Sequence, residues 1–304
     1  MSGGWLRWTA IATAGIVVAA AVFIYLRPVN IFVGFAELKM LFEDAHSRFT
    51  SVAGMRIHYY VMGPENGQAV VLIHGLGGRS EDWRNLAPCL KRAGYRVYIP
   101  DLPGYGQSER PAHFSYSVRD EAGVVAAFFD KMDLKQVDLG GWSMGGWIVQ
   151  LVAAEHPQRV KKLMLFDSAG IRVRPTWNTA LFTPTNAKEL AQLDDLLMPH
   201  PPHLPGFIAR DVLRVSKEDA WVIERALRSM MTGHDVTDAM LPEMNMPILI
   251  VWGSADHITP LSEGNEMHSL APHAELDVIG GCGHLAPVQC SREIAPGMIG
   301  FLAR

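Results

Sequence analysis

The chain has 304 residues, 49% of them hydrophobic, and a formal net charge of -4 at pH 7. A chain of this length can bury the core of one large domain and still carry an additional segment. Its mild acidity, without a run of lysine and arginine residues, argues against a nucleic-acid partner, because phosphate binding depends on a concentrated basic surface.

A long apolar segment lies at residues 8–26. It reads WTAIATAGIVVAAAVFIYL, with no charge and no proline, between Arg7 and Arg27. A helix of this length spans roughly 28 Å, which is close to the hydrocarbon thickness of a bilayer. We therefore expect residues 1–27 to form an uncleaved single-pass transmembrane anchor. The alternative is a cleaved signal peptide, because the alanines at 19–21 form a small-residue motif. Basic residues on both sides leave the membrane orientation undecided.

The next segment, residues 28–48, has a helical pattern. Four apolar residues recur at the spacing of one helix face, namely Ile31, Phe35, Leu38 and Phe42. The pattern predicts a juxtamembrane amphipathic helix. Such a helix can rest in the lipid headgroup region, or it can pack on the globular domain; the sequence does not choose between the two.

From residue 49 onward, short strand-like segments alternate with helical ones. We expect strands at 56–63, 69–75, 95–100, 136–142, 161–166, 247–253 and 274–280, and helices at 80–94, 117–134, 144–156 and 292–303, with Ser80 as an N-cap. Continuous apolar runs such as residues 69–75 are typical of strands buried on both faces. The alternation predicts a mostly parallel central sheet with helices on both faces, formed by residues 49–170 and 247–304.

Residues 171–246 interrupt this alternation. They are rich in proline, contain a helical run at 217–231, and are too long for a simple connection between strands. We expect them to form a helical cap or lid inserted into the core. The apolar side chains of this segment can line an acyl tunnel or form the core of the cap itself: Leu181, Phe182, Leu196, Leu197, Met198, Leu204, Phe207 and Ile208.

The three cysteines, Cys89, Cys282 and Cys290, do not form a disulfide framework. Cys282 and Cys290 could pair in an oxidising compartment, but spacing alone does not show it, and we expect free thiols. No cysteine and histidine spacing is typical of a zinc site, so we expect no metal.

The sharpest motif is G-x-S-x-G at residues 141–145, between an expected strand and an expected helix. In that setting the motif predicts a nucleophile elbow, in which Gly141 and Gly145 leave room for a tight turn that exposes the Ser143 hydroxyl. The backbone N–H of Met144, near the start of the helix, can donate to a developing oxyanion.

A serine hydroxyl needs a general base at neutral pH. His284 follows the last expected strand, from which a loop can reach the elbow, and Asp256 follows the strand at 247–253. A carboxylate at that position can orient the imidazole and stabilise its charged form. Asp167, after the preceding strand, is a less favoured substitute acid, and His257 is expected to point elsewhere.

Residues 74–78 read HGLGG at the end of another expected strand. The glycines let backbone N–H groups approach a bound ester closely. The N–H of Leu76 is therefore a candidate for the second oxyanion donor, beside that of Met144.

Five segments together resemble the α/β-hydrolase superfamily: HGLGG at 74–78, DLPGYGQS at 101–108, GWSMGG at 141–146, VWGSAD at 251–256 and GGCGH at 280–284. The resemblance covers residue 69 to the C-terminus. It implies an α/β-hydrolase fold with a mostly parallel central sheet and a helical cap insertion, to which this sequence adds an N-terminal transmembrane helix. The order nucleophile, acid, base then assigns these roles to Ser143, Asp256 and His284.

With its expected anchor and cap, the chain is similar to membrane-bound monoacylglycerol lipases and related bacterial phospholipases, also in FDSAGIR at 166–172 and VWGSADHITP at 251–260. Serine at 143 sets it apart from epoxide hydrolases and haloalkane dehalogenases, which resemble this layout but carry aspartate there. One departure concerns the residues after His284. Many relatives have an acidic residue and proline where this chain has APVQCS, which leaves the substrate open.

The residues and the resemblance predict a serine carboxylic-ester hydrolase that acts through an acyl-enzyme on lipid or other apolar acyl esters, of the monoacylglycerol, lysophospholipid or phospholipid type. The expected partners are a lipid or small-molecule ester and the membrane, with no cofactor. One alternative is cleavage of a carbon–carbon, amide or thioester bond by the same residues. Another is a non-catalytic ligand-binding homologue, which would usually have lost one of them.

Overall fold

A computed structural model describes residues 3–304. Its eight strands form one sheet in the order β1-β2-β4-β3-β5-β6-β7-β8. β2 pairs antiparallel with β1 and β4, and the other neighbouring strands pair in parallel. The predicted mostly parallel sheet is therefore confirmed. The strands are β1 (His46–Val52), β2 (Met55–Met62), β3 (Ala69–Ile73), β4 (Arg96–Pro100), β5 (Val137–Trp142), β6 (Val160–Phe166), β7 (Ile248–Gly253) and β8 (Glu275–Ile279).

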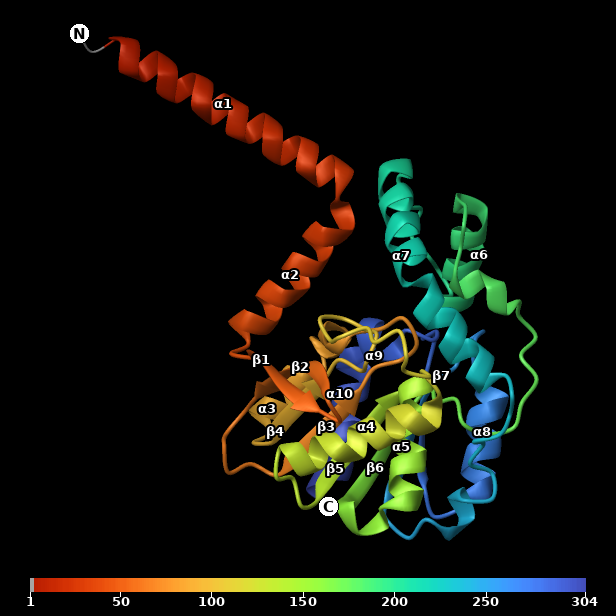
Figure 1. The fold of residues 1–304 in the computed structure, drawn as a ribbon. Coiled ribbons are helices and arrows are strands. Elements are labelled where there is room, and N and C mark those ends of the chain that lie inside the picture. The colour runs from red at the N-terminus through yellow and green to blue at the C-terminus, as the bar shows by residue number, and fades with distance from the viewer. Residues whose placement is uncertain (1–2) are drawn as a thin grey trace.

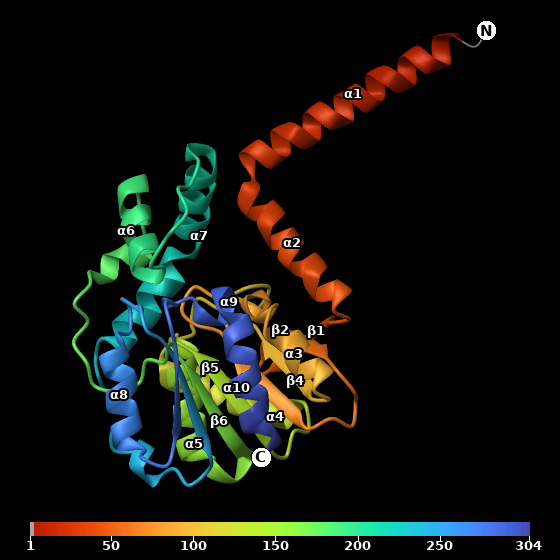
Figure 2. The same cartoon turned by 180° about the vertical axis from the view of Figure 1, so that it is seen from behind.

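Helices cover both faces of this sheet (Figure 1, Figure 2). Residues of α4, α5 and α8 share one apolar cluster with one face, and residues of α3 and α10 share a second cluster with the other. The central strands β5 and β7 are buried along their whole length. The α-helices are α1 (Gly3–Leu26), α2 (Pro28–Phe42), α3 (Ala87–Arg92), α4 (Val118–Lys131), α5 (Met144–Glu155), α6 (Ala187–Leu197), α7 (Gly206–Met230), α8 (Leu261–Leu270), α9 (Ala286–Gln289) and α10 (Ser291–Ala303).

The prediction of one continuous helix at 80–94 is wrong. The segment begins as a short 3₁₀ turn, η1 (Ser80–Trp83), and resumes as α3 from Ala87. Pro88 has no N–H to donate and is tolerated in the first turn of a helix, so α3 starts just before it. Arg79, and not Ser80, occupies the N-cap position, and the Asp82 side chain accepts a hydrogen bond from its N–H at 2.9 Å.

At the N-terminal end, α1 projects away from the globular body and α2 folds back onto it (Figure 1). Among the described residues, no single helix combines the length and apolarity needed to cross a bilayer. Ala19–Leu26 and α2 satisfy that criterion only together, as two helices bent by 96°. The expected single span is thus not found as one helix, and residues 1 and 2 of the predicted anchor lie outside the described residues.

The helix predicted at 28–48 ends earlier, at Phe42, because strand β1 begins at His46. α2 packs on the globular domain through Ala36 and Met40, which are buried. Its predicted apolar stripe faces the other way: Phe35 is 66% exposed and Phe42 is 80% exposed. The helix therefore has two apolar faces, of which only one is covered by protein.

Between β6 and β7 the chain runs through η3 (Thr179–Phe182), α6, α7 and η4 (Leu241–Glu243). α6 and α7 stand beyond one end of the sheet strands (Figure 1, Figure 2). α7 starts at Gly206, eleven residues before the predicted helical run at 217. Asp211 of α7 accepts a hydrogen bond from the Val29 N–H at 3.0 Å, which ties α7 to the first turn of α2. The role of residues 171–246 as a cap stays a prediction.

Candidate active site

Ser143 lies in the sharp turn between β5 and α5. Its backbone has φ 56° and ψ -120°, a conformation that a non-glycine residue adopts only where the surrounding structure holds it. A Cβ atom at Gly141 would clash with the carbonyl oxygen of Gly145, and one at Gly145 would clash with that of His74. The close backbone contacts therefore require glycine at both elbow positions, as predicted. The turn leaves the Ser143 hydroxyl at the carboxyl end of β5.

The three predicted catalytic side chains meet above this edge of the sheet. His284 Nε2 lies 2.9 Å from Ser143 Oγ, and His284 Nδ1 lies 2.7 Å from Asp256 Oδ2. His284 and Asp256 are only 3% and 4% exposed, so the chain of hydrogen bonds is shielded from water except at the serine. With Nδ1–H donated to the carboxylate, Nε2 is free to take the serine proton.

Three residues that the sequence did not single out hold this chain of side chains in place. The Thr259 hydroxyl donates to Asp256 Oδ2 at 2.8 Å, and the Ile258 and Thr259 N–H groups donate to Oδ1 at 2.7 and 3.0 Å. On the other side, the Trp142 indole N–H donates to the His284 carbonyl oxygen at 2.8 Å. The acid and the base are thus each fixed by neighbours as well as by one another.

The substitute candidates lie elsewhere. Asp167 is buried at the end of β6, where its Oδ1 accepts a hydrogen bond from the Gly253 N–H at 2.7 Å. The His284 ring bonds to Asp256 instead. His257 is exposed, and its Nδ1 lies 3.3 Å from the Asp195 carbonyl oxygen, away from Ser143.

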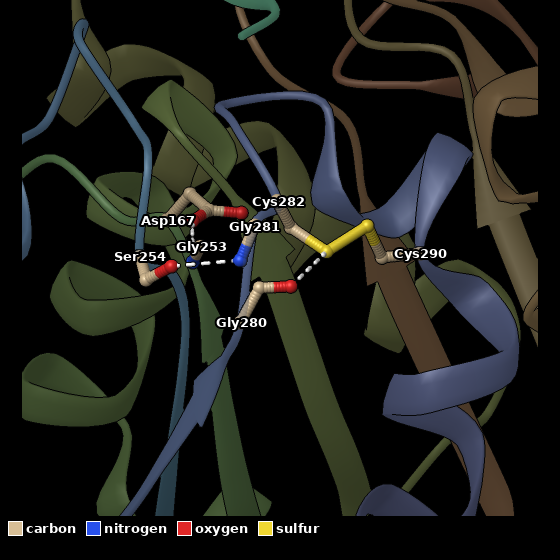
Figure 3. The surroundings of a disulfide bond; sticks show 7 residues. All are labelled: Asp167, Gly253, Ser254, Gly280, Gly281, Cys282 and Cys290. Carbon is tan, nitrogen blue, oxygen red and sulfur yellow. Dashed lines mark hydrogen bonds between the residues drawn. A yellow bond between two sulfur atoms is a disulfide. The ribbon is translucent and has the colours of Figure 1, made fainter.

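The loops that carry Asp256 and His284 are joined to each other. The Ala255 N–H donates to the Cys282 carbonyl oxygen at 2.8 Å, and the Gly281 N–H donates to the Ser254 hydroxyl at 2.8 Å. Figure 3 shows this second bond beside a disulfide between Cys282 and Cys290. Asp256 after β7 and His284 after β8 therefore lie on two loops that are hydrogen-bonded to each other.

The expectation of free thiols at Cys282 and Cys290 is wrong. The short helix α9 turns the chain back on itself after His284, which brings the two Cα atoms to 6.4 Å, within disulfide range. The resulting bridge, drawn in Figure 3, closes the segment 282–290 of the chain, which contains His284. Cys89 is the free cysteine.

The loop with the predicted oxyanion donor Leu76 is braced by His74. This ring is fully buried; its Nε2 accepts the Leu102 N–H at 3.0 Å, and its Nδ1–H donates to the Gly75 carbonyl oxygen at 2.8 Å. Both nitrogens are used as in neutral imidazole, and burial lowers the pKa of His74. Leu76 lines the same cavities as Ser143, and Met144 follows Ser143 at the first position of α5.

Two cavities open onto Ser143. One, of about 360 Å³, runs under the 169–177 segment and the end of α7; the other, of about 450 Å³, lies between α2, α6 and α7. Both are predominantly apolar and share Leu76, Ser143 and Phe182. Of the eight side chains considered for an acyl tunnel, Phe182 and Leu197 line these cavities, whereas the other six line neither. Most of the lining could not be predicted from the sequence, because its residues come from segments far apart in the chain. Examples are Val29, Trp147 and Ile258.

One acidic side chain, Glu263 in the first turn of α8, also lines the first cavity. Burial, followed by the charges of Asp256 and Glu266, raises the pKa of Glu263 to about 7. Nothing in its local sequence indicated this, since a glutamate near a helix start is ordinarily a solvated residue.

A serine, a histidine and an aspartate joined in this order at the carboxyl edge of a mostly parallel sheet define the class of hydrolases with a nucleophile elbow. A model of the alpha/beta hydrolase fold family matches residues 68–226, slightly more than half of the chain. The chain therefore belongs to the α/β-hydrolase family, and it is a hydrolase of this fold.

The names of individual relatives point to different reactions. Lipase 1 of Psychrobacter immobilis is 27% identical over 266 residues, 83% of this chain and 82% of that protein. The 2-hydroxy-6-oxononadienedioate/2-hydroxy-6-oxononatrienedioate hydrolase of Escherichia coli K12 is 29% identical over 288 residues, 86% of this chain and 97% of that protein. Among solved structures, a membrane phospholipase A, described as a bacterial virulence factor, superposes with a TM-score of 0.82 at 25% identity over 98% of both chains.

Proposed function

We propose that this hydrolase is a serine carboxylic-ester hydrolase that acts on lipid or other apolar acyl esters. The observation that carries the proposal is the hydrogen-bonded chain of Ser143, His284 and Asp256, at 2.9 and 2.7 Å, opening into apolar cavities. Such a chain supplies an activated hydroxyl and a proton carrier, and the cavities supply room for an acyl chain and an alcohol.

The reaction has two halves. Ser143 Oγ attacks the ester carbonyl carbon while its proton passes to His284 Nε2, and Asp256 stabilises the imidazolium that forms. The N–H groups of Leu76 and Met144 donate to the carbonyl oxygen as it gains charge. The ester C–O bond then breaks, His284 protonates the leaving alcohol, and the acyl group stays on Ser143. In the second half His284 takes a proton from water, whose oxygen attacks the acyl carbon; the bond to Ser143 Oγ breaks, His284 returns the proton to Oγ, and the carboxylic acid is released.

The lipid character of the substrate is supported by the apolar surfaces of the chain. Twelve of the sixteen large hydrophobic side chains that are exposed among the described residues lie between Trp8 and Phe42, in α1 and α2. Exposed apolar patches of this extent are typical of protein–protein or membrane contact sites. The similarity to a membrane phospholipase A over 98% of this chain points the same way. Residues 1–27 therefore anchor the protein to a membrane, with α2 lying along the lipid surface.

Turnover by the detergent-solubilised full chain tests the proposed reaction. We expect hydrolysis of p-nitrophenyl esters and monoacylglycerols, and a loss of at least about 10³-fold in kcat for Ser143→Ala, because removal of such a nucleophile leaves only binding and oxyanion donation. Ser51→Ala, at an exposed position on β1, is the matched control. A loss of less than about tenfold in Ser143→Ala would contradict the proposal.

A second candidate reaction, cleavage of a carbon–carbon bond, is favoured by the similarity to the Escherichia coli 2-hydroxy-6-oxononadienedioate hydrolase. The two reactions separate in a substrate panel that contains glycerolipids, lysophospholipids, simple esters and a 2-hydroxy-6-oxo-dienoate. Ester turnover without loss of the dienoate chromophore supports the ester hydrolase. Loss of the chromophore without ester turnover replaces it by the carbon–carbon hydrolase.

A further inference from the structure

A second carboxylic acid, Asp167, lies beside the chain of Ser143, His284 and Asp256. It follows the last residue of β6 and is completely buried. Figure 3 shows its side chain directed at Gly253, whose N–H donates to Asp167 Oδ1 at 2.7 Å. The other oxygen, Oδ2, is buried as well, and within residues 3–304 no donor reaches it. Half of this carboxyl group is therefore without the hydrogen bonds that an anion needs.

An ionised Asp167 would be costly in these surroundings. A buried carboxylate with one unsatisfied oxygen loses its hydration without compensation, and no lysine or arginine pairs with it in the described part of the chain. The titratable groups around it are Asp256 from the loop after β7, His284 beyond Asp256, and Glu263 of α8, which also faces Asp256. Burial first, and then the charge and hydrogen bonding of Asp256, raise the pKa of Asp167 well above its ordinary value. Burial, the unsatisfied oxygen and the neighbouring carboxylate thus favour the protonated form of Asp167.

A protonated carboxyl group carries a donor and needs an acceptor. The Asp256 carboxylate is the acceptor next to it. Around Asp256 the structure already places the Thr259 hydroxyl at 2.8 Å from Oδ2, and the same hydroxyl lies 3.2 Å from the Asp167 carbonyl oxygen. The backbone of Asp167 is itself fixed by its N–H, which donates to the Val251 carbonyl oxygen at 2.9 Å. Asp167, Thr259 and Asp256 therefore form one connected polar group behind His284.

We propose that Asp167 is a positioning residue: as a neutral carboxylic acid it donates a hydrogen bond to the Asp256 carboxylate and holds that group against His284. This inference rests on the proposed function, because it assigns a role within the same site. The pair then carries one negative charge, located on the carboxylate that faces the imidazole. A second anion beside it would change the charge that His284 experiences, and a missing donor would leave Asp256 less well oriented.

The test compares two substitutions that differ in the donor. Asp167→Asn keeps the shape and an N–H donor, whereas Asp167→Leu keeps the branching of the side chain but removes the donor, together with the acceptor for the Gly253 N–H. We expect kcat for ester hydrolysis to fall about threefold in Asp167→Asn and about 10- to 100-fold in Asp167→Leu, the range typical for loss of an orienting partner. KM should change less than about threefold in both, because neither variant alters the cavities. Equal losses in the two variants would overturn the proposal.

The pH profile of kcat/KM distinguishes a neutral Asp167 from an anionic one. If Asp167 is neutral, its replacement by Asn removes no charge, and the acid limb set by the general base stays in place. If Asp167 is an anion, the same substitution removes a negative charge near His284 and shifts that limb toward lower pH by about one unit. Such a shift would overturn the proposal even if both variants remained active.

Infrared difference spectroscopy of the wild type against Asp167→Asn measures the proton directly and needs no activity. We expect a protonated-carboxyl C=O band at pH 7 that is lost in the variant; its absence from the wild type refutes the proposal. The melting temperature of Asp167→Leu is measured alongside, because this variant could unfold. If it unfolds, the infrared spectra and the kinetics of Asp167→Asn decide the question. A wild type without ester turnover but with this band counts against the proposed function alone.

Discussion

The position of the Asp256 carboxylate depends on individual hydrogen bonds. Asp256 receives four donors besides any from Asp167: two backbone N–H groups, the Thr259 hydroxyl and the His284 ring. Backbone donors fix the position of one oxygen, but the oxygen that faces His284 is shared between the ring and the Thr259 hydroxyl. The orientation of the base therefore depends on a side chain that takes no part in the chemistry.

Thr259→Val removes this hydroxyl and keeps the shape of the side chain. We expect kcat for ester hydrolysis to fall roughly 10-fold with little change in KM, because the Asp256 oxygen loses a buried donor, a loss of about 1–3 kcal/mol in the pairing of that group. Steady-state kinetics on a p-nitrophenyl ester measures the effect. Thr259→Ser, which keeps the hydroxyl, should stay within about threefold of the wild type; an equal loss in both variants would assign the effect to packing.

A half-buried acid that lines the first cavity, Glu263, makes stability depend on pH. The pKa of Glu263 is raised to about 7, so the folded chain holds this proton more tightly than the unfolded chain does. The resulting stabilisation is present at low pH and is lost as pH rises through about 7. We expect Glu263→Gln to raise the melting temperature relative to the wild type more at pH 8 than at pH 5. Glu65→Gln, at an exposed position, should show no such trend, and a difference that is larger at pH 5 would reverse the assignment.

At the scale of residues, the sequence predicts those site residues that directly follow a strand of the sheet. Ser143, Asp256 and His284 follow three different strands of a parallel sheet, and the carboxyl ends of such strands share one edge, so their meeting can be predicted. Thr259 and Trp142 could not be found in this way, and Asp167 was found only as a substitute acid, without its contacts. Their contacts depend on the path of individual loops and on which side chain turns inward, and neither has a spacing pattern.

Among the elements, the loop from Cys282 to Cys290 carries His284, the proposed general base, and has little regular structure apart from the four-residue α9. Its disulfide closes eight residues of sequence separation around His284. A bridge of this span stabilises the folded state by about 2.5 kcal/mol in the chain-entropy model, because it restricts the unfolded chain. It also limits how far the imidazole can move from Ser143.

We therefore expect the double variant Cys282→Ser and Cys290→Ser to lower both the free energy of unfolding, by about 2.5 kcal/mol, and kcat. Chemical denaturation and ester turnover measure the two effects. Cys89→Ser removes the free cysteine and should change neither. Unaltered turnover and stability in the double variant would show that the loop is held by its hydrogen bonds alone.

The sequence patterns missed three elements, and the reason differs from one element to the next. β1 is an edge strand with four consecutive exposed residues from His46, so it lacks the apolar run of an inner strand. α8 contains Gly264, which is buried against the Trp252 ring where a Cβ atom would clash. Packing overrides helix propensity there. α6 did have a readable signal: the Asn186 side chain accepts from the N–H groups of Lys188 and Glu189 as an N-cap.

For the molecule as a whole, the uncovered apolar surface of α1 and α2 is the largest departure from an ordinary soluble domain. α2 buries Ala36 and Met40 against the core and turns Phe35, Leu38 and Phe42 outward. One helix thus joins the catalytic domain to whatever surface covers its outer face, and the proposed function assigns that surface to lipid.

The contribution of α2 can be separated from that of α1 by the double variant Leu38→Ser and Phe42→Ser in the full chain. We expect it to sediment with membranes as the wild type does, since the proposed anchor at residues 1–27 is unchanged, but to hydrolyse long-chain esters in vesicles more slowly. Its turnover of a soluble short-chain ester should match that of the wild type. Slower turnover of the soluble ester as well would place the defect inside the folded domain, contrary to a role at the lipid surface.

The central claim is that Ser143 is an activated nucleophile, and covalent labelling tests it most directly. The detergent-solubilised full chain is treated with a fluorophosphonate, and the adduct is located by mass spectrometry of peptides. We expect a single adduct on Ser143, absent in Ser143→Ala and formed at least about 100-fold more slowly in His284→Ala, because the unassisted hydroxyl is a weak nucleophile. An unmodified Ser143, or labelling that proceeds equally fast without His284, would contradict it.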